Sequence, residues 1–107
     1  MSDTLRRVRR LVAEGEVRIS AHGYDELMAD GLLAVEVIEG VADGACVEDY
    51  PDYAKGPCVL VLQQDREGRP IHVVWGIPRN ADSPAVLVTA YRPDAEQWSA
   101  DFMRRKP

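Results

Sequence analysis

The chain has 107 residues, of which 46% are hydrophobic and 29% charged, and this arithmetic indicates one compact domain spanning residues 1–107. A two-domain enzyme is therefore excluded. No apolar run approaches the roughly 18 residues that a membrane helix needs, and the charged first residues do not resemble a signal peptide. Two cysteines are too few for a disulfide-held secreted scaffold, so we expect a cytoplasmic protein with reduced thiols that does not contact membranes.

The net charge of −5 is unevenly distributed along the chain. Residues 1–13 carry a charge of +3 and residues 66–107 carry +2. Residues 14–65 carry −10, because they hold twelve acidic side chains against only Arg18 and Lys55. A polyanion would therefore meet the chain ends or the last strands, and we expect the acidic middle to be solvated or to face a basic partner.

Apolar residues at helical spacing predict three helices in the first half of the chain. The first covers Asp3–Ala13, and the short stretch Val17–Ile19 that follows is expected to be an extended link. The second, His22–Ala29, starts after the capping residue Ser20, and the third covers Leu32–Ala42. One face of the second helix carries the apolar side chains of Tyr24, Leu27 and Met28.

After the third predicted helix, the spacing of the apolar residues changes from that of helices to that of strands. Segments rich in β-branched and aromatic residues predict four strands, at Cys46–Tyr50, Cys58–Leu62, Ile71–Ile77 and Ala85–Tyr91. The short linkers between them favour an antiparallel meander. We therefore predict an α+β fold in which N-terminal helices pack on one face of a four-stranded antiparallel sheet.

The tail from Pro93 is expected to form a short C-terminal helix with Trp98 and Phe102 facing inward. The chain contains no Gly-rich phosphate loop, no zinc-binding cysteine pairs and no Gly-x-Ser-x-Gly elbow. The acidic residues around Asp49 match no recognised ligand spacing. We accordingly expect no cofactor and no metal.

Seven short stretches, taken together, resemble the domain-of-unknown-function family 4258. They are Ile19-Ser-x-His22, Glu26-Leu-Met28, Val35-x-Val-Ile-x-x-Val41, Glu48-Asp-Tyr-Pro51, Val59-Leu-Val-Leu62, Gly68-Arg-Pro-Ile-His-Val-Val74 and Val88-Thr-Ala-Tyr-Arg-Pro-Asp94. The resemblance covers about residues 17–95, and the last two stretches are the most specific. It implies a small bacterial protein with a fold like that of the RelE/ParE toxins, in which helices lead into an antiparallel sheet, and a toxin-like domain that cleaves RNA.

The sequence departs from the family pattern after the second helix. Proteins of the family usually have an arginine there, whereas this chain reads Met28-Ala-Asp-Gly-Leu-Leu33. Asp30 brings the opposite charge to the face expected to meet phosphate. The departure weakens the expected affinity for phosphate.

Cleavage of RNA without a metal needs a base, an acid and cationic groups for the phosphate. Histidine is the residue type whose unperturbed pKa lies nearest neutrality, which makes His22 and His72 candidates, and Glu26 lies one helical turn after His22. Tyr91 could donate to phosphate or stack on a base. The predicted catalytic residues are therefore His22, His72, Glu26 and Tyr91, and the predicted phosphate-binding residues are Arg69, Arg79 and Arg92.

Each candidate also has a structural interpretation. His22 could help to cap the second helix, and Arg69 lies in a charged turn where it could be solvated. His72 lies on the face opposite Ile71, so it is a core residue if that face meets the helices and a site residue if it lines a groove. Two functions remain open: a ribonuclease toxin with RNA and an antitoxin as partners, or a non-catalytic protein-binding module on the same fold.

Overall fold

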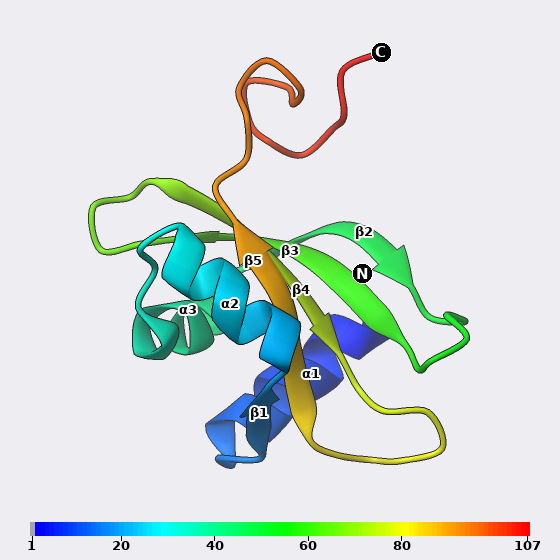
Figure 1. Cartoon of the computed structure of the whole chain (residues 1–107). Helices are drawn as coiled ribbons and strands as arrows, with labels where there is room; N and C mark the ends of the chain where they lie inside the picture. Colours follow the sequence, from blue (N-terminus) through cyan, green and yellow to red (C-terminus); the bar gives the residue numbers. More distant parts are fainter. Residues whose placement is uncertain (1) are drawn as a thin grey trace.

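The computed structural model describes residues 2–107 and shows an α+β domain (Figure 1). Its helices are α1 (Asp3–Ala13), α2 (Ala21–Ala29), α3 (Ala34–Glu39) and the short 3-10 helix η1 (Gly40–Asp43). Its strands are β1 (Val17–Ile19), β2 (Ala45–Tyr50), β3 (Cys58–Gln64), β4 (Pro70–Gly76) and β5 (Ala85–Tyr91). None of the helices within residues 2–107 is long and apolar enough to cross a membrane.

The sheet has five strands rather than the predicted four. Its order is β1-β5-β4-β3-β2, and β2 to β5 form the expected antiparallel meander. The stretch Val17–Ile19, predicted as a link, instead pairs in parallel with β5, with Val17 opposite Ala85. Three residues carry too little periodicity to indicate a strand, and their partner lies at the far end of the sequence. The prediction of a purely antiparallel sheet was therefore wrong.

Helix α1 confirms the first predicted helix and covers one face of the sheet. The Ser2 hydroxyl accepts a hydrogen bond from the backbone N–H of Leu5 at 3.0 Å, which caps the first turn. Leu5, Val8 and Leu11 lie on the apolar side of the helix and are buried. They join a core with strand residues such as Trp75. We call this side of the sheet the inner face and the opposite side the outer face.

Helix α2 packs closely against β5 near the edge of the sheet. The Ser20 hydroxyl accepts from the N–H of Gly23 at 2.9 Å and donates to the carbonyl of Val88 at 2.9 Å. A Cβ at Gly23 would lie 2.6 Å from the carbonyl oxygen of Leu87, so only glycine permits this approach. Of the apolar residues predicted on one face of this helix, only Leu27 is buried.

The third predicted helix is shorter than Leu32–Ala42 because its hydrogen-bond pattern changes at Gly40. The side-chain amide of Gln63 donates to the carbonyl of Val37 at 2.6 Å, which is the acceptor that the next α-helical turn would use. The Gln63 side chain also accepts from the indole N–H of Trp75 at 2.9 Å. The chain therefore continues past Gly40 as the tighter turn η1.

The predicted C-terminal helix is absent. Side chains compete with the backbone for hydrogen bonds here: the Asp94 carboxylate accepts from the N–H of Glu96, and the Asp101 carboxylate accepts from the N–H of Met103. The chain then turns back so that Trp98 and Arg105 form an isolated bridge. Only Trp98 is buried as predicted, while Phe102 is partly exposed. We call residues 93–107 the C-terminal segment, and Figure 1 shows it beyond the end of β5.

Candidate functional site

His72 lies on the outer face of the sheet, as its alternation with Ile71 and Val73 predicts. Ile71 and Val73 belong to the core on the inner face. His72 nevertheless has a relative exposure of 0%, because the C-terminal segment covers this end of the outer face. The sequence analysis offered two interpretations of His72, a core residue beneath the helices or a site residue that lines a groove. Neither describes the structure, because the C-terminal segment, and not the helices, buries this side chain.

Both nitrogens of the His72 ring are engaged. Nε2 lies 2.9 Å from the carbonyl oxygen of Phe102, which can only accept, so Nε2 carries the proton. Nδ1 is then the acceptor for the Tyr91 hydroxyl at 3.2 Å. The ring of Trp98 meets the imidazole edge-on at 4.3 Å between centroids. Two of the predicted catalytic residues, His72 and Tyr91, therefore do contact each other, but within a closed structural cluster.

Burial determines the ionisation of this cluster. Burial lowers the pKa of His72, outweighing the hydrogen bond to the Phe102 carbonyl, which raises it. Burial also raises the pKa of Tyr91, which keeps its hydroxyl protonated. A neutral imidazole can donate one hydrogen bond and accept one, and the Phe102 carbonyl and the Tyr91 hydroxyl provide these two partners. The cluster can hold the C-terminal segment in place, and it offers no free lone pair to a substrate.

The lowered pKa of His72 predicts that stability decreases at acidic pH. The folded state resists protonation below the ordinary value of 6.5, whereas the unfolded chain takes up the proton, so the free energy of unfolding is highest above that pH. We expect the urea midpoint to fall as the pH is lowered from about 7.5 to about 5.5. His72→Phe removes the titrating group and should reduce this fall. An equal fall in both proteins would contradict the assignment to His72.

His22 has different neighbours from His72. Its side chain is 67% exposed on α2, and its Nε2 lies 3.8 Å from a carboxylate oxygen of Glu26, one helical turn away as predicted. No hydrogen bond or ion pair links it to His72 among the described residues. An acid and a base that act on one phosphate must both reach it, and the buried His72 is not accessible from outside.

Two of the predicted phosphate-binding arginines are already paired with Asp65. Its carboxylate lies 2.8 Å from the Arg92 guanidinium and 3.4 Å from that of Arg69. It also accepts backbone N–H groups from Glu67 and Arg69, and together these hydrogen bonds lower the pKa of Asp65 to about 2. Arg79 lies elsewhere, in the β4–β5 loop, where its backbone N–H donates to the carbonyl of Lys55 at 3.1 Å. The three arginines do not form one phosphate site.

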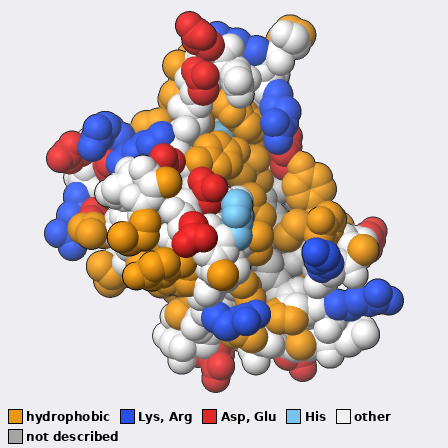
Figure 2. Space-filling model, viewed as in Figure 1, with side chains coloured by type: hydrophobic (Ala, Val, Ile, Leu, Met, Phe, Trp, Pro, Cys, Tyr) orange, Lys and Arg blue, Asp and Glu red, His pale blue; other side chains and the backbone are white. Residues whose placement is uncertain are grey.

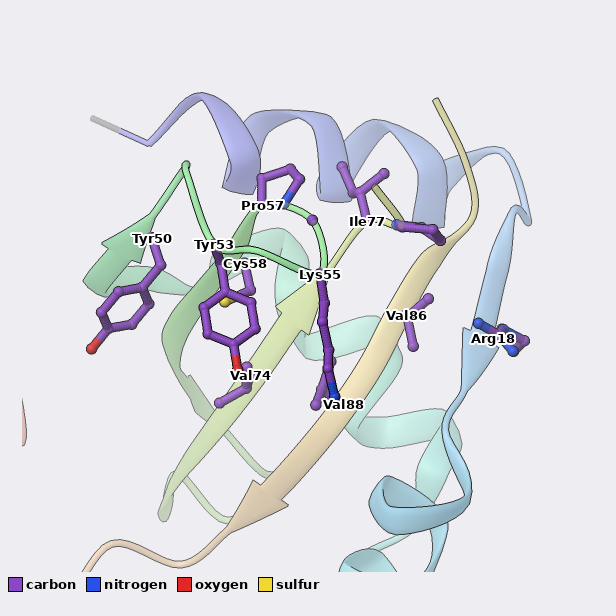
Figure 3. A pocket seen from close by; sticks show the side chains of 13 residues that line it. Arg18, Tyr50, Tyr53, Lys55, Pro57, Cys58, Val74, Ile77, Val86 and Val88 are labelled. Carbon is purple, nitrogen blue, oxygen red and sulfur yellow. The ribbon is translucent and has the colours of Figure 1, made fainter. Parts of the chain in front are cut away.

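The outer face does contain an open cavity, which the sequence analysis missed. Its volume is about 590 Å³, and it lies between the β2–β3 loop and the strands β3, β4 and β5 (Figure 3). Its lining residues are Arg18, Tyr50, Tyr53, Lys55, Gly56, Pro57, Cys58, Val74, Gly76, Ile77, Pro78, Val86 and Val88. One sequence signal pointed to it: both basic side chains of the acidic middle, Arg18 and Lys55, line this cavity.

The described residues offer no evident metal centre. Within residues 2–107 no group of three or more His, Cys, Asp or Glu side chains is placed to hold a metal ion. Cys46 and Cys58 are free thiols, and burial raises the pKa of both. Cys46 packs against the inner core, whereas Cys58 lines the cavity, so the two cysteines lie on opposite faces of the sheet.

Comparison with known proteins identifies a family but no function. No protein of curated function and no solved structure matches the chain. A family model described as a domain of unknown function (DUF4258) matches residues 19–92, well over half of the chain. These residues include β1 in part and every later strand, with His22, His72 and the loop that carries Lys55. The chain therefore belongs to the DUF4258 family.

Proposed function

We propose that this protein is a non-catalytic binding module for a protein partner, built on a RelE/ParE-like fold. The observation that carries the proposal is an exposed apolar surface on α2, α3 and the turn between them. Six large apolar side chains are exposed within residues 2–107, and four of them belong to this surface. We call it the α2–α3 patch, and it consists of Tyr24, Met28, Leu33 and Val35.

The α2–α3 patch is exposed because the inner sides of the same helices already fill the core. Leu27 and Val37 are buried there, while the four patch residues have exposures between 55% and 68%. Tyr24 and Met28 are four residues apart and therefore share one side of α2. Figure 2 shows hydrophobic side chains gathered over α3. Large apolar side chains grouped on a surface are typical of protein interfaces.

The charge around the patch indicates the kind of partner. Asp25, Asp30 and Glu39 are exposed acidic residues on or beside the two helices. The segment that contains them holds most of the negative charge of the chain. A partner that places an apolar anchor on the patch and basic side chains around it would be complementary to this surface. An antitoxin or another basic protein segment fits this description.

The ribonuclease hypothesis finds less support in the same geometry. It needs an accessible acid–base pair beside free cations, and His72 is enclosed while Arg69 and Arg92 are already paired with carboxylates. The binding-module proposal therefore expects that purified protein leaves RNA intact. Cleavage that is lost in a folded His22→Ala variant would restore the enzyme hypothesis.

The patch predicts a specific loss of partner binding. The double variant Met28→Lys/Leu33→Lys places two positive charges where the partner's apolar anchor and basic side chains would sit, so we expect affinity to fall by at least about tenfold. The bait is the whole chain in extract from its own cells, read by quantitative mass spectrometry. Any candidate is then purified and titrated by calorimetry.

Tyr53→Lys is the matched control, because it makes the same kind of change at an exposed large side chain outside the patch. The proposal expects one protein to be retained by the wild type and by Tyr53→Lys and to be lost from the double variant. A purified partner that binds all three proteins equally would contradict the assignment to the α2–α3 patch. A partner that is lost from Tyr53→Lys but retained by the double variant would place the interface on the outer sheet face instead.

A further inference from the structure

We propose that the cavity on the outer face binds a small organic molecule with an apolar body and a single anionic group. We call it the Arg18–Lys55 cavity, after its two cationic residues. It is distinct from the α2–α3 patch, because none of the four patch residues lines it. The proposal therefore goes beyond partner binding and rests on separate residues.

The cavity is held open by the backbone of the loop that roofs it. The carbonyl of Pro57 accepts from the N–H of Ile77 at 3.0 Å, and the carbonyl of Lys55 accepts from the N–H of Arg79 at 3.1 Å. These two hydrogen bonds join the β2–β3 loop to the β4–β5 loop. The roof is thus fixed to the strands beneath it, as expected of binding sites that are largely preformed.

The floor of the cavity is apolar. Cys58, Val74, Val86 and Val88 line it from β3, β4 and β5, and no polar side chain of these strands does so. Figure 3 shows Tyr53 and Lys55 extending from the loop along the sheet towards Val74 and Val88. At about 590 Å³ the space is in the range of small-molecule sites. Filling such a floor with an apolar group removes it from water, which favours binding.

The charge of the cavity is opposite to that of the surrounding chain. Arg18 and Lys55 are the only charged residues that line it, and neither forms a salt bridge with any described residue. By contrast, Arg66, Arg69 and Arg92 each have a carboxylate partner. The cavity thus combines two free cations with an apolar floor, and an anion is the complementary group.

The surrounding charge limits the ligand to one anionic group. Only two cations line the cavity, and the stretch that supplies them carries −10 overall, which disfavours a long polyanion. A carboxylate, sulfonate or phosphate ester would pair with Arg18 or Lys55, which lie on opposite sides of Val86 in Figure 3. Its ring or chain would rest on the valines beside Tyr53. The ligand class is therefore a compact amphipathic anion.

The test uses anilinonaphthalene sulfonate, an aromatic anion whose fluorescence rises when it leaves water. We expect saturable binding to the wild type, and affinity about tenfold weaker for Arg18→Gln/Lys55→Gln, which keeps a polar side chain at both positions but removes the charge. Phenylnaphthylamine, which lacks the sulfonate, should bind wild type and variant equally. If the variant binds the sulfonate as tightly as the wild type, the proposal is overturned.

A chemical footprint locates the probe. Cys58 lines the cavity and Cys46 does not, so bound anilinonaphthalene sulfonate should slow the reaction of Cys58 with iodoacetamide and leave that of Cys46 unchanged. Mass spectrometry separates the two alkylated peptides. Met28→Lys/Leu33→Lys serves as the control for the α2–α3 patch. Probe binding that is lost in this control, without protection of Cys58, would place the probe on the patch and overturn the cavity site.

Discussion

Replacing His72 with alanine is expected to lower the free energy of unfolding by about 3 kcal/mol. The side chain is fully buried, so its removal leaves a cavity against the ring of Trp98. It also leaves the Tyr91 hydroxyl and the Phe102 carbonyl without their partner. Urea denaturation followed by circular dichroism measures the loss, and the C-terminal segment should become sensitive to protease at the same time.

His22→Ala is the matched control for this variant. The His22 side chain is exposed and its nearest charged group, Glu26, is 3.8 Å away, so we expect a change within about 0.5 kcal/mol. The comparison separates the structural role of His72 from the catalytic one. A His72→Ala protein as stable as the wild type would contradict the structural role and would make the catalytic hypothesis worth testing on RNA.

Gly56→Ala is expected to be the second strongly destabilising change, with a cost of about 2–4 kcal/mol. Gly56 has a φ of +122°, a conformation that residues with a side chain rarely adopt. A Cβ there would lie 2.1 Å from the carbonyl oxygen of Ile77, which is backbone and cannot move aside alone. The loop should therefore detach from Ile77, and thermal unfolding should begin at lower temperature.

Gly68→Ala provides the control for backbone strain without a clash. Gly68 also has a positive φ, +79°, but a Cβ there would meet nothing within 4 Å. We expect this variant to lose about 1 kcal/mol, the ordinary cost of a left-handed residue with a side chain. Equal losses at Gly56 and Gly68 would show that the close approach to Ile77 does not matter. The difference between the two therefore measures how tightly the roof of the Arg18–Lys55 cavity is held.

The outer face of the sheet is divided into two parts. At one end the C-terminal segment closes over His72, and at the other the β2–β3 loop leaves the Arg18–Lys55 cavity open. Trp98 and Phe102, which enclose His72, lie outside residues 19–92, the part that matches the DUF4258 family. The burial of His72 in this chain thus depends on residues that the family model does not describe.

Local periodicity was enough to predict several elements of the fold. The helix α1 has the predicted bounds, and its buried residues Leu5, Val8 and Leu11 recur at helical spacing. The prediction succeeds because the buried side of an amphipathic helix is formed by residues close together in the sequence. The antiparallel order of β2 to β5 was also predicted, since short linkers leave neighbouring strands few other arrangements. The position of His72 on the face opposite Ile71 followed from the twofold alternation of a strand.

Candidate site residues were predicted by type but not by environment. The sequence around a histidine on a strand does not indicate whether its side chain is buried or exposed. The contact of His72 with Phe102 joins residues thirty positions apart. The sequence likewise does not indicate that Arg69 and Arg92 are both paired with Asp65 in the folded chain. Pairing and burial of this kind depend on distant parts of the chain, so spacing alone cannot reveal them.

The sequence by itself determined the α+β class, the first helix, the four-strand meander and the concentration of negative charge around Arg18 and Lys55, because composition and short-range spacing record these properties. Only the tertiary structure decided that β1 joins β5, that the C-terminal segment covers His72, and that Arg18 and Lys55 both line one cavity. Each of these brings together segments far apart in the chain, and their contacts form only when the whole domain packs.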